Sequence, residues 1–237
     1  MNAMILAAGL GTRLGGLGRT VPKALIDIGG KPLLERHLEY LELQGVSGVA
    51  INAHHRSEQI VGFAEHYSGP LDIVVVIEDT LLGTAGGVRN ALAHLEPGPF
   101  IVLYGDVVVD QPLDAMLALH RDRGAVATLA VHHSESAEGK GVVVVDDVDR
   151  VTRFAEKQTS ARGPALINSG LYILETDLVA PLVPGVATDF GADVLPGAVD
   201  AGLPVMAFRL ASAVIDIGTP DGLAQARAAA AAADSAR

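Results

Sequence analysis

Short apolar runs alternate with amphipathic stretches through the first half of the chain. The runs, among them AMILAA and LDIVVVIED, are apolar at most positions in succession. Stretches between them, such as KPLLERHLEYLELQG, place apolar residues three and four positions apart, which is typical of a helix. Strands that are apolar on both faces indicate a parallel sheet covered by helices on each side. The pattern predicts strands at 3–8, 49–53, 71–79 and 99–106, and helices at 31–45, 58–67 and 84–96.

The second half of the pattern is richer in strands. After a helix at 111–122, it predicts strands at 125–133, 141–147, 150–157 and 165–174, and a last helix from about residue 220. No linker rich in Pro, Gly or Ser separates the halves, so we expect one domain over 1–237, with halves at about 1–110 and 111–226. The alanine-rich tail at 227–237 favours helix but has little to bury, so we expect it to fray. The expected fold is a Rossmann-like, doubly wound mixed α/β sheet in three layers, with ligands at the carboxyl ends of the strands.

Composition narrows the classes of function. With no cysteine, disulfides, thiolate metal sites and cysteine nucleophiles are excluded. The net charge of −11 would repel a nucleic-acid backbone, so we expect no nucleic-acid partner. No apolar run reaches the roughly 18 residues of a membrane span, and Met1 leads directly into a strand. We therefore expect a cytoplasmic protein without a membrane partner.

The stretch LAAGLGTRLGGLGRTVPKAL, residues 6–25, follows the first predicted strand and combines five glycines with three cationic side chains. Glycines allow backbone N–H groups to approach an anion closely, so the loop is a candidate phosphate-binding loop. The dinucleotide fingerprint GxGxxG fails because Leu14 stands at its third glycine, and the P-loop GxxxxGK[ST] has no match. These two known phosphate loops are therefore disfavoured.

The segment GLGTRL at 9–14, followed by Pro22 and Lys23, resembles the signature of the sugar-phosphate nucleotidyltransferases, also called nucleotide-sugar pyrophosphorylases. The resemblance implies the GT-A-like fold of that family, with the nucleotide in the first half and the sugar phosphate in the second. It also implies that Arg13, Lys23 and Asp106 are catalytic, and that Arg13 and Lys23 contact the phosphates. The nucleotide-binding residues that it implies are Leu6, Ala8, Gly9, Gly11, Thr12, Glu78, Gly83 and Thr84.

The segment IEDTLLGTAGGV resembles the part of these enzymes that reads the base. Glu78 stands five positions before Gly83, where the family places a Gln or Glu against the base edge. A carboxylate accepts hydrogen bonds but cannot donate them, so it suits the two adjacent donors of guanine. Uracil and thymine, with one donor each, remain open.

Two aspartates follow strands at positions where the family holds Mg²⁺. Asp106 ends LYGD, and Asp216 lies in AVIDIGTPDG, in which Val214 replaces the usual Trp. The resemblance implies that both carboxylates bind Mg²⁺, and oxygen ligands that bridge a metal to phosphates suit this ion. Adjacent histidine pairs point to opposite sides of a strand, so we expect the eight histidines to be structural or exposed.

Further segments resemble the acceptor side of the family. FAEKQ is similar to its EKP segment, although Gln158 replaces the proline, and it implies that Glu156 binds sugar hydroxyls and Lys157 the sugar phosphate. INSGLYIL and KGVVVV imply that Asn168 and Gly141 lie at the sugar. DFGADVLP at 189–196 resembles a segment of glucose- and mannose-type members, but no chemistry follows from it.

The resemblance implies transfer of a nucleoside monophosphate from an NTP to a sugar 1-phosphate, with pyrophosphate as the second product, in nucleotide-sugar biosynthesis. The chain ends soon after the Asp216 segment, as in compact members that act on heptose, mannose, glucose or N-acetylmuramic acid 1-phosphates. The segments EDTLLGTAGG and INSGLYIL are most similar to heptose or mannose 1-phosphate guanylyltransferases, which favours GTP. Alternatives are uridylyl, thymidylyl or adenylyl transfer to another sugar 1-phosphate and cytidylyl transfer to phosphocholine. A non-catalytic nucleotide-sugar sensor is a further alternative, and family members are often homo-oligomers.

Overall fold

The computed structural model describes residues 1–156 and 163–235. Its helices and strands confirm the predicted α/β class, and its main sheet contains nine strands. The chain divides into two compact units, of which the first combines 1–81, 103–110 and 214–237, and the second 82–102 and 111–213. Strand β6 (Pro99–Tyr104) begins in the second unit and ends in the first.

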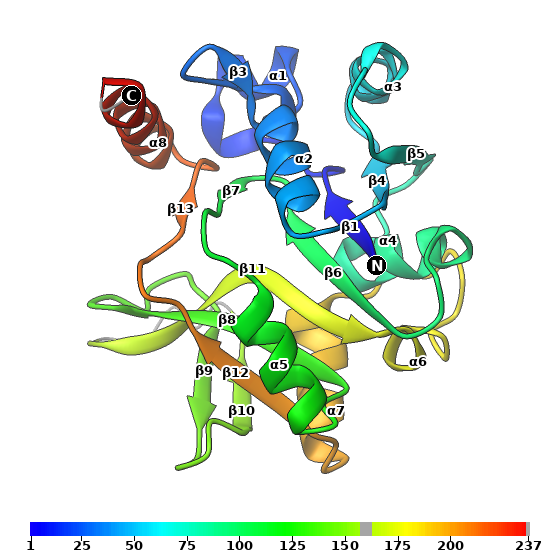
Figure 1. The fold of residues 1–237 in the computed structure, drawn as a ribbon, viewed down its shortest axis with the longest axis vertical. Helices are drawn as coiled ribbons and strands as arrows, with labels where there is room; N and C mark the ends of the chain where they lie inside the picture. The colour runs from blue at the N-terminus through cyan, green and yellow to red at the C-terminus, as the bar shows by residue number, and fades with distance from the viewer. Residues whose placement is uncertain (157–162, 236–237) are drawn as a thin grey trace. The chain divides into compact units, whose positions relative to one another are not determined.

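The first unit contains the parallel strands that the continuous apolar runs predict. Strand β4 (Gly48–Ala53) pairs in parallel with β1 (Asn2–Leu6) and with β5 (Asp72–Ile77). Helix α2 (Leu33–Leu43) joins β1 to β4 through the intervening loop, and α3 (Ser57–His66) joins β4 to β5 (Figure 1). All six residues of β4 are buried, as expected for a strand covered on both faces.

The last helix completes a small core in the first unit. Helix α8 (Pro220–Ser235) buries Leu223 and Ala226 against Ile26, Ile28 and Leu33. The tail was predicted to have little to bury, but the helix continues to Ser235, and its residue Ala230 packs against this cluster. The remaining short elements of this unit are η1 (Thr12–Leu14), α1 (Gly16–Thr20), η2 (Lys23–Leu25), β2 (Asp27–Ile28), β3 (Lys31–Pro32), β7 (Val107–Val108) and β13 (Ile215–Asp216).

The second unit is mostly antiparallel, which makes the sheet mixed, as predicted. Strand β11 (Ala165–Glu175) pairs with β8 (Ala127–Ser134) and β9 (Val142–Val145), and β10 (Val151–Ala155) pairs with β9, all antiparallel. Strand β12 (Val205–Arg209), which the pattern did not predict, runs parallel to β8. Helix α5 (Asp114–Asp122) packs against β8 and β12 (Figure 1). The other helices are α4 (Gly83–Ala91), η3 (Leu92–His94), α6 (Thr176–Val179), η4 (Phe190–Val194) and α7 (Leu195–Asp200).

Across the described residues, no helix combines the length and the apolar character that a membrane crossing requires.

Candidate active site

The glycine-rich loop closes on itself by direct backbone contact. Gly11 has a φ of +67°, in the left-handed region that favours glycine, and it precedes η1. A Cβ atom at Gly18 would lie 2.1 Å from the carbonyl oxygen of Gly11, so only glycine fits there. The close approach of Gly11 and Gly18 lies beside the short helix η1, which carries Arg13 with 62% of its side chain exposed.

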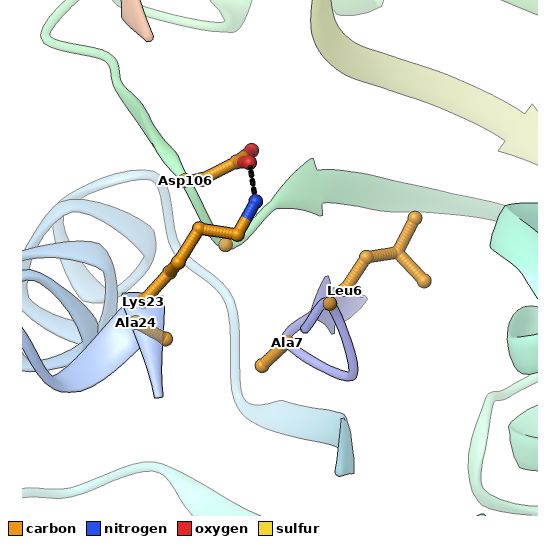
Figure 2. Close-up of a pocket in the computed structure, with 7 residues that line it drawn as sticks. Leu6, Ala7, Lys23, Ala24 and Asp106 are labelled. Atoms are coloured by element: carbon orange, nitrogen blue, oxygen red, sulfur yellow. Dashed lines mark hydrogen bonds and ion pairs between the residues drawn. The ribbon is translucent and has the colours of Figure 1, made fainter. Parts of the chain in front are cut away.

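Lys23 and Asp106 meet at a small pocket in the first unit. Their side chains point toward one another and form an ion pair (Figure 2). The N–H group of Gly105 donates to the carbonyl oxygen of Leu6 at 2.9 Å, and a Cβ atom at Gly105 would lie 2.7 Å from the same oxygen. The glycine before Asp106 therefore allows the backbone to approach the end of β1. The residues that line the pocket are Leu6, Ala7, Gly9, Lys23, Ala24, Gly105 and Asp106.

Asp216, the second predicted metal ligand, lies close to Asp106 because β13 pairs with β7. Asp216 on β13 lies opposite Val107 on β7, one residue after Asp106. The Nη2 atom of Arg13 is 3.9 Å from the Oδ2 atom of Asp216. The structure thus brings together Arg13, Lys23, Asp106 and Asp216, the four charged residues of this unit that the family motifs place at the phosphates and the metal.

Gly218 marks the space that these charged groups share. A Cβ atom at this position would lie 2.8 Å from Oδ1 of Asp216, 2.9 Å from Nη2 of Arg13 and 3.5 Å from Oδ2 of Asp106. Any side chain at Gly218 would fill the space that the carboxylates and the guanidinium face. Gly218 was not predicted from the sequence, although it directly precedes the Thr of the IDIGT motif.

The donor atoms around this space fit a magnesium ion. Asp106 and Asp216 offer carboxylate oxygens, which are hard ligands. Among the residues that the structure describes, no three His, Asp or Glu side chains gather in a geometry for a metal. Mg²⁺ is commonly held by one or two carboxylates, with substrate phosphates and water as the other ligands. Two carboxylates that face an open space match this pattern.

His37 supports the backbone next to Asp106. Its Nε2 atom is 2.7 Å from the carbonyl oxygen of Val107, to which the neutral ring donates. Burial disfavours the charged ring and lowers the pKa of His37 to about 4, although the carbonyl and the charge of Asp106 oppose this shift. Helix α2 therefore anchors the strand that follows Asp106 with an uncharged donor.

Glu78, the predicted base-reading residue, is buried at the end of β5. Its Oε1 atom accepts a hydrogen bond of 2.7 Å from Nδ2 of Asn52, whose Oδ1 accepts one of 2.8 Å from the N–H group of Ala7. The carbonyl oxygen of Glu78 lies 2.8 Å from Nδ1 of His54. Asn52 was not predicted from the sequence, although a polar residue inside the apolar run VAINA was an available signal.

The second unit brings three of the predicted acceptor residues together. A Cβ atom at Gly141 would lie 3.1 Å from Oε2 of Glu156 and 3.4 Å from Cβ of Asn168. Asn168 donates through Nδ2 to the hydroxyl oxygen of Tyr172 at 2.6 Å. Lys157, the predicted ligand of the sugar phosphate, lies outside the described residues.

The DFGADVLP segment, to which no chemistry was assigned from its motif, contacts Glu156, one of the predicted acceptor residues. A Cβ atom at Gly191 would lie 2.2 Å from Oε2 of Glu156, so the carboxylate sits where a larger residue would be. The ring of Phe190 packs edge-on against Tyr172, with ring centroids 5.7 Å apart. These contacts bring residues far apart in the sequence to one place, so local spacing could not reveal them.

The same segment caps the helix that follows the predicted base-reading stretch. The N–H and hydroxyl groups of Thr84 both donate to Oδ1 of Asp189, at 3.1 and 2.9 Å. The next two N–H groups of α4 donate to the carbonyl oxygen of Thr188. Gly83 has a φ of +72°, and a Cβ atom there would lie 2.6 Å from that same oxygen. The first amides of this helix are therefore already bonded within the unit.

Known proteins resemble this chain over nearly all of its length. UTP–glucose-1-phosphate uridylyltransferase of Synechocystis sp. is 34% identical over 238 residues, which cover 93% of this chain and 61% of that protein. Mannose-1-phosphate guanyltransferase of Schizosaccharomyces pombe is 32% identical over 227 residues, again with 93% and 61% covered. The chain thus spans about three fifths of the length of these curated relatives.

A solved structure resembles the chain in both fold and sequence. HddC from Yersinia pseudotuberculosis, complexed with GMP-PN, has a TM-score of 0.82 and 29% sequence identity, and the match covers 96% of this chain and 98% of HddC. Residues 2–233 of the chain match the family described as nucleotidyl transferase. The family resemblance of the motifs is thereby confirmed, and the chain belongs to the nucleotidyl transferase family.

Proposed function

We propose that the protein transfers a nucleoside monophosphate from an NTP to a sugar 1-phosphate and releases pyrophosphate. The observation that carries the proposal is the convergence of Arg13, Lys23, Asp106 and Asp216 in the first unit. Relatives named as glucose-1-phosphate uridylyltransferase and mannose-1-phosphate guanyltransferase support the same reaction class.

The reaction joins two polyanions, so neutralising their mutual repulsion is its main electrostatic requirement. An oxygen of the sugar phosphate attacks the α-phosphorus, a new P–O bond forms, and the bond to the β-phosphate oxygen breaks with pyrophosphate as the leaving group. The attacking oxygen is already anionic, so the protein supplies no base. Positioning of the reactants and stabilisation of charge on the phosphate oxygens would provide the catalysis.

The cations of the loop would exchange partners when the triphosphate binds. In the structure, Lys23 pairs with Asp106 and Arg13 lies near Asp216. Phosphate oxygens would take both cations, which leaves the two carboxylates for Mg²⁺. The ion, when bound, supplies positive charge that offsets the charge on the phosphate oxygens. Gly9, Gly11 and Thr12 would present the loop backbone, with Leu6 and Ala8 alongside it.

We propose GTP as the preferred nucleotide. A carboxylate at Glu78 matches the two adjacent donors of guanine, and the similar protein HddC was crystallised with GMP-PN. Gly83 and Thr84 would complete the base-reading stretch. On the acceptor side, Gly141, Glu156, Lys157 and Asn168 would bind the sugar 1-phosphate, so the first half of the chain would hold the nucleotide and the second the acceptor.

Pyrophosphate release tests the proposal directly. We would assay ATP, CTP, GTP, UTP and dTTP against mannose, glucose and heptose 1-phosphates, with and without Mg²⁺. Release that needs the metal and is fastest from GTP with one sugar is the expected result. Faster release from UTP would favour uridylyl transfer, which the Synechocystis relative supports. Tight nucleotide binding without release from any pair would contradict the proposed activity.

A further inference from the structure

Asn52 lies at the centre of a buried chain of hydrogen bonds that the reaction described above does not use. Its Oδ1 atom accepts from the N–H group of Ala7 at 2.8 Å, and its Nδ2 atom donates to Oε1 of Glu78 at 2.7 Å. Only 2% of Asn52 and 3% of Glu78 are exposed. Ala7 itself lines the pocket of Lys23 and Asp106 (Figure 2).

We propose that Asn52 is a positioning residue for base selection, which fixes the carboxylate of Glu78 relative to the pocket backbone at Ala7. The proposal rests on the proposed function, in which Glu78 reads the base. Nothing in the family motifs assigns a role to Asn52. Its effect would be on the choice of base and not on the chemical step.

The polarity of the two hydrogen bonds explains why an asparagine stands here. The backbone N–H group of Ala7 can only donate, so the oxygen of the amide must face it. The amide nitrogen must then face Glu78, whose carboxylate accepts. Aspartate would keep the bond to Ala7 but would place two carboxylates within hydrogen-bond distance, and leucine would leave both partners of Asn52 without their bond.

A fixed carboxylate can discriminate between bases better than a freely rotating one. Guanine presents N1–H and N2–H side by side, and two parallel bonds form only if the carboxylate keeps the right plane. Asn52 holds one oxygen of Glu78 at a point that is set by the backbone of two neighbouring strands, β1 and β4. One oxygen of the Glu78 carboxylate is therefore held in place, which restricts the rotation of the group.

Comparison of GTP with ITP gives a direct test, because hypoxanthine lacks the N2 amino group of guanine. We would measure the binding of both nucleotides by calorimetry, and the rate of pyrophosphate release, for the wild type and for Asn52→Asp. The wild type should bind GTP more tightly than ITP, and Asn52→Asp should reduce this preference by about tenfold, the value of one good base contact.

The double variant N52D/E78Q separates positioning from mere stability. It exchanges donor and acceptor between the two side chains, so the hydrogen bond can form again and the melting temperature should recover. The preference for GTP should stay lost, because an amide has replaced the carboxylate that faces the base. Thr128→Val is a matched control, since Thr128 is fully buried and its Oγ1 lies 2.9 Å from His120 in the second unit. It should lower the melting temperature and leave the GTP preference unchanged.

Several results would overturn the inference. Equal losses of GTP and ITP affinity in Asn52→Asp would make Asn52 a stability residue, like Thr128. A wild-type protein that binds the two nucleotides equally would also refute it, even if it transfers a nucleotide. Failure of the proposed function is distinguishable, because it appears as absent pyrophosphate release while the GTP preference in binding persists.

Discussion

Within each unit, the carboxylates of the predicted site residues are held in a different way. In the first, Asp106 and Asp216 lie beside Lys23 and Arg13. In the second, Glu156 fits against two glycines, Gly141 and Gly191, where side chains would collide with it. Ion pairs can exchange partners when an anionic ligand arrives, whereas a steric fit keeps one position. The difference suits the proposed roles, in which the first unit binds the phosphates of the NTP and the second binds the sugar.

The largest expected effect on turnover comes from breaking the ion pair between Lys23 and Asp106. Asp106→Asn removes the partner of Lys23 and one of the two carboxylates that fit Mg²⁺, and we expect turnover to fall by about 10³-fold. The side chain is partly exposed and the amide has the same shape, so the melting temperature should change little. Pyrophosphate release and thermal unfolding measure the two effects. Turnover within tenfold of the wild type would remove Asp106 from the site.

Arg13→Ala tests the exposed cation of the same unit. Its guanidinium lies 3.9 Å from Asp216 but is mostly exposed, so it contributes little to stability without a ligand. We expect kcat/KM for the NTP to fall by about 10²-fold, because one contact to the phosphates is lost. Arg19→Ala is the matched control, since Arg19 lies on α1 in the same loop and is also exposed. Equal losses in the two variants would mean that general positive charge, not position, matters.

His37, which bonds to the backbone next to Asp106, should make the free energy of unfolding depend on pH. The pKa of His37 is about 4 in the folded protein against 6.5 in the unfolded chain. Below pH 6.5, His37 binds a proton in the unfolded chain, but in the folded protein it stays neutral down to about pH 4. The free energy of unfolding therefore falls as the pH falls through this window. At pH 5 the loss is about 2 kcal/mol relative to pH 7.

Urea unfolding at pH 7 and pH 5 measures this step. His37→Leu should be less stable than the wild type at both pH values, because it loses the hydrogen bond to Val107. Its loss of stability from pH 7 to pH 5, however, should be smaller than that of the wild type by about 2 kcal/mol. Burial also lowers the pKa of His120 and His132 in the second unit. These two residues should account for the loss of stability between pH 7 and pH 5 that remains in His37→Leu. An unchanged step in His37→Leu would show that His37 does not resist protonation.

The smallest expected effect concerns the steric fit of the second unit. A Cβ atom in Gly191→Ala would displace the carboxylate of Glu156, which is the flexible end of a side chain, so stability should change little. We expect KM for the sugar phosphate to rise about tenfold while KM for the NTP stays constant. Gly197→Ala is the control, because a Cβ atom there meets no atom within 4 Å. A rise in both KM values would contradict the assignment of Glu156 to the acceptor.

Long apolar runs allowed much of the fold to be predicted from the sequence. Strands β1, β4, β8 and β11 lie where such runs were found, because burial on both faces leaves a strong local signal. Strand β12 was missed because a run as short as VMAFR does not distinguish strand from helix. The pairing of β7 with β13 involves two residues from each strand, which is too few for any periodicity.

The motifs located charged residues of the candidate site, but not the neighbours that orient them. Asp106 and Asp216 stand in recognisable segments. Asn52, in contrast, contacts residues 45 and 26 positions away, and Gly218 is defined by the side chains around it. Such roles arise from tertiary contacts, so a local signal such as the polar residue in VAINA can mark Asn52 but cannot identify its partners.

The packing of α8 has a consequence for the order in which the protein is made. Arg227 donates to the carbonyl oxygen of Asp27, 200 positions earlier, and Leu223 and Ala226 complete the core around Ile26 and Ile28. During synthesis, the core around residues 26–33 cannot form until α8 has left the ribosome. All residues of the second unit, in contrast, are available once residue 213 has emerged. We therefore expect the second unit to fold first, and the charged cluster, which needs Asp216, to form after it.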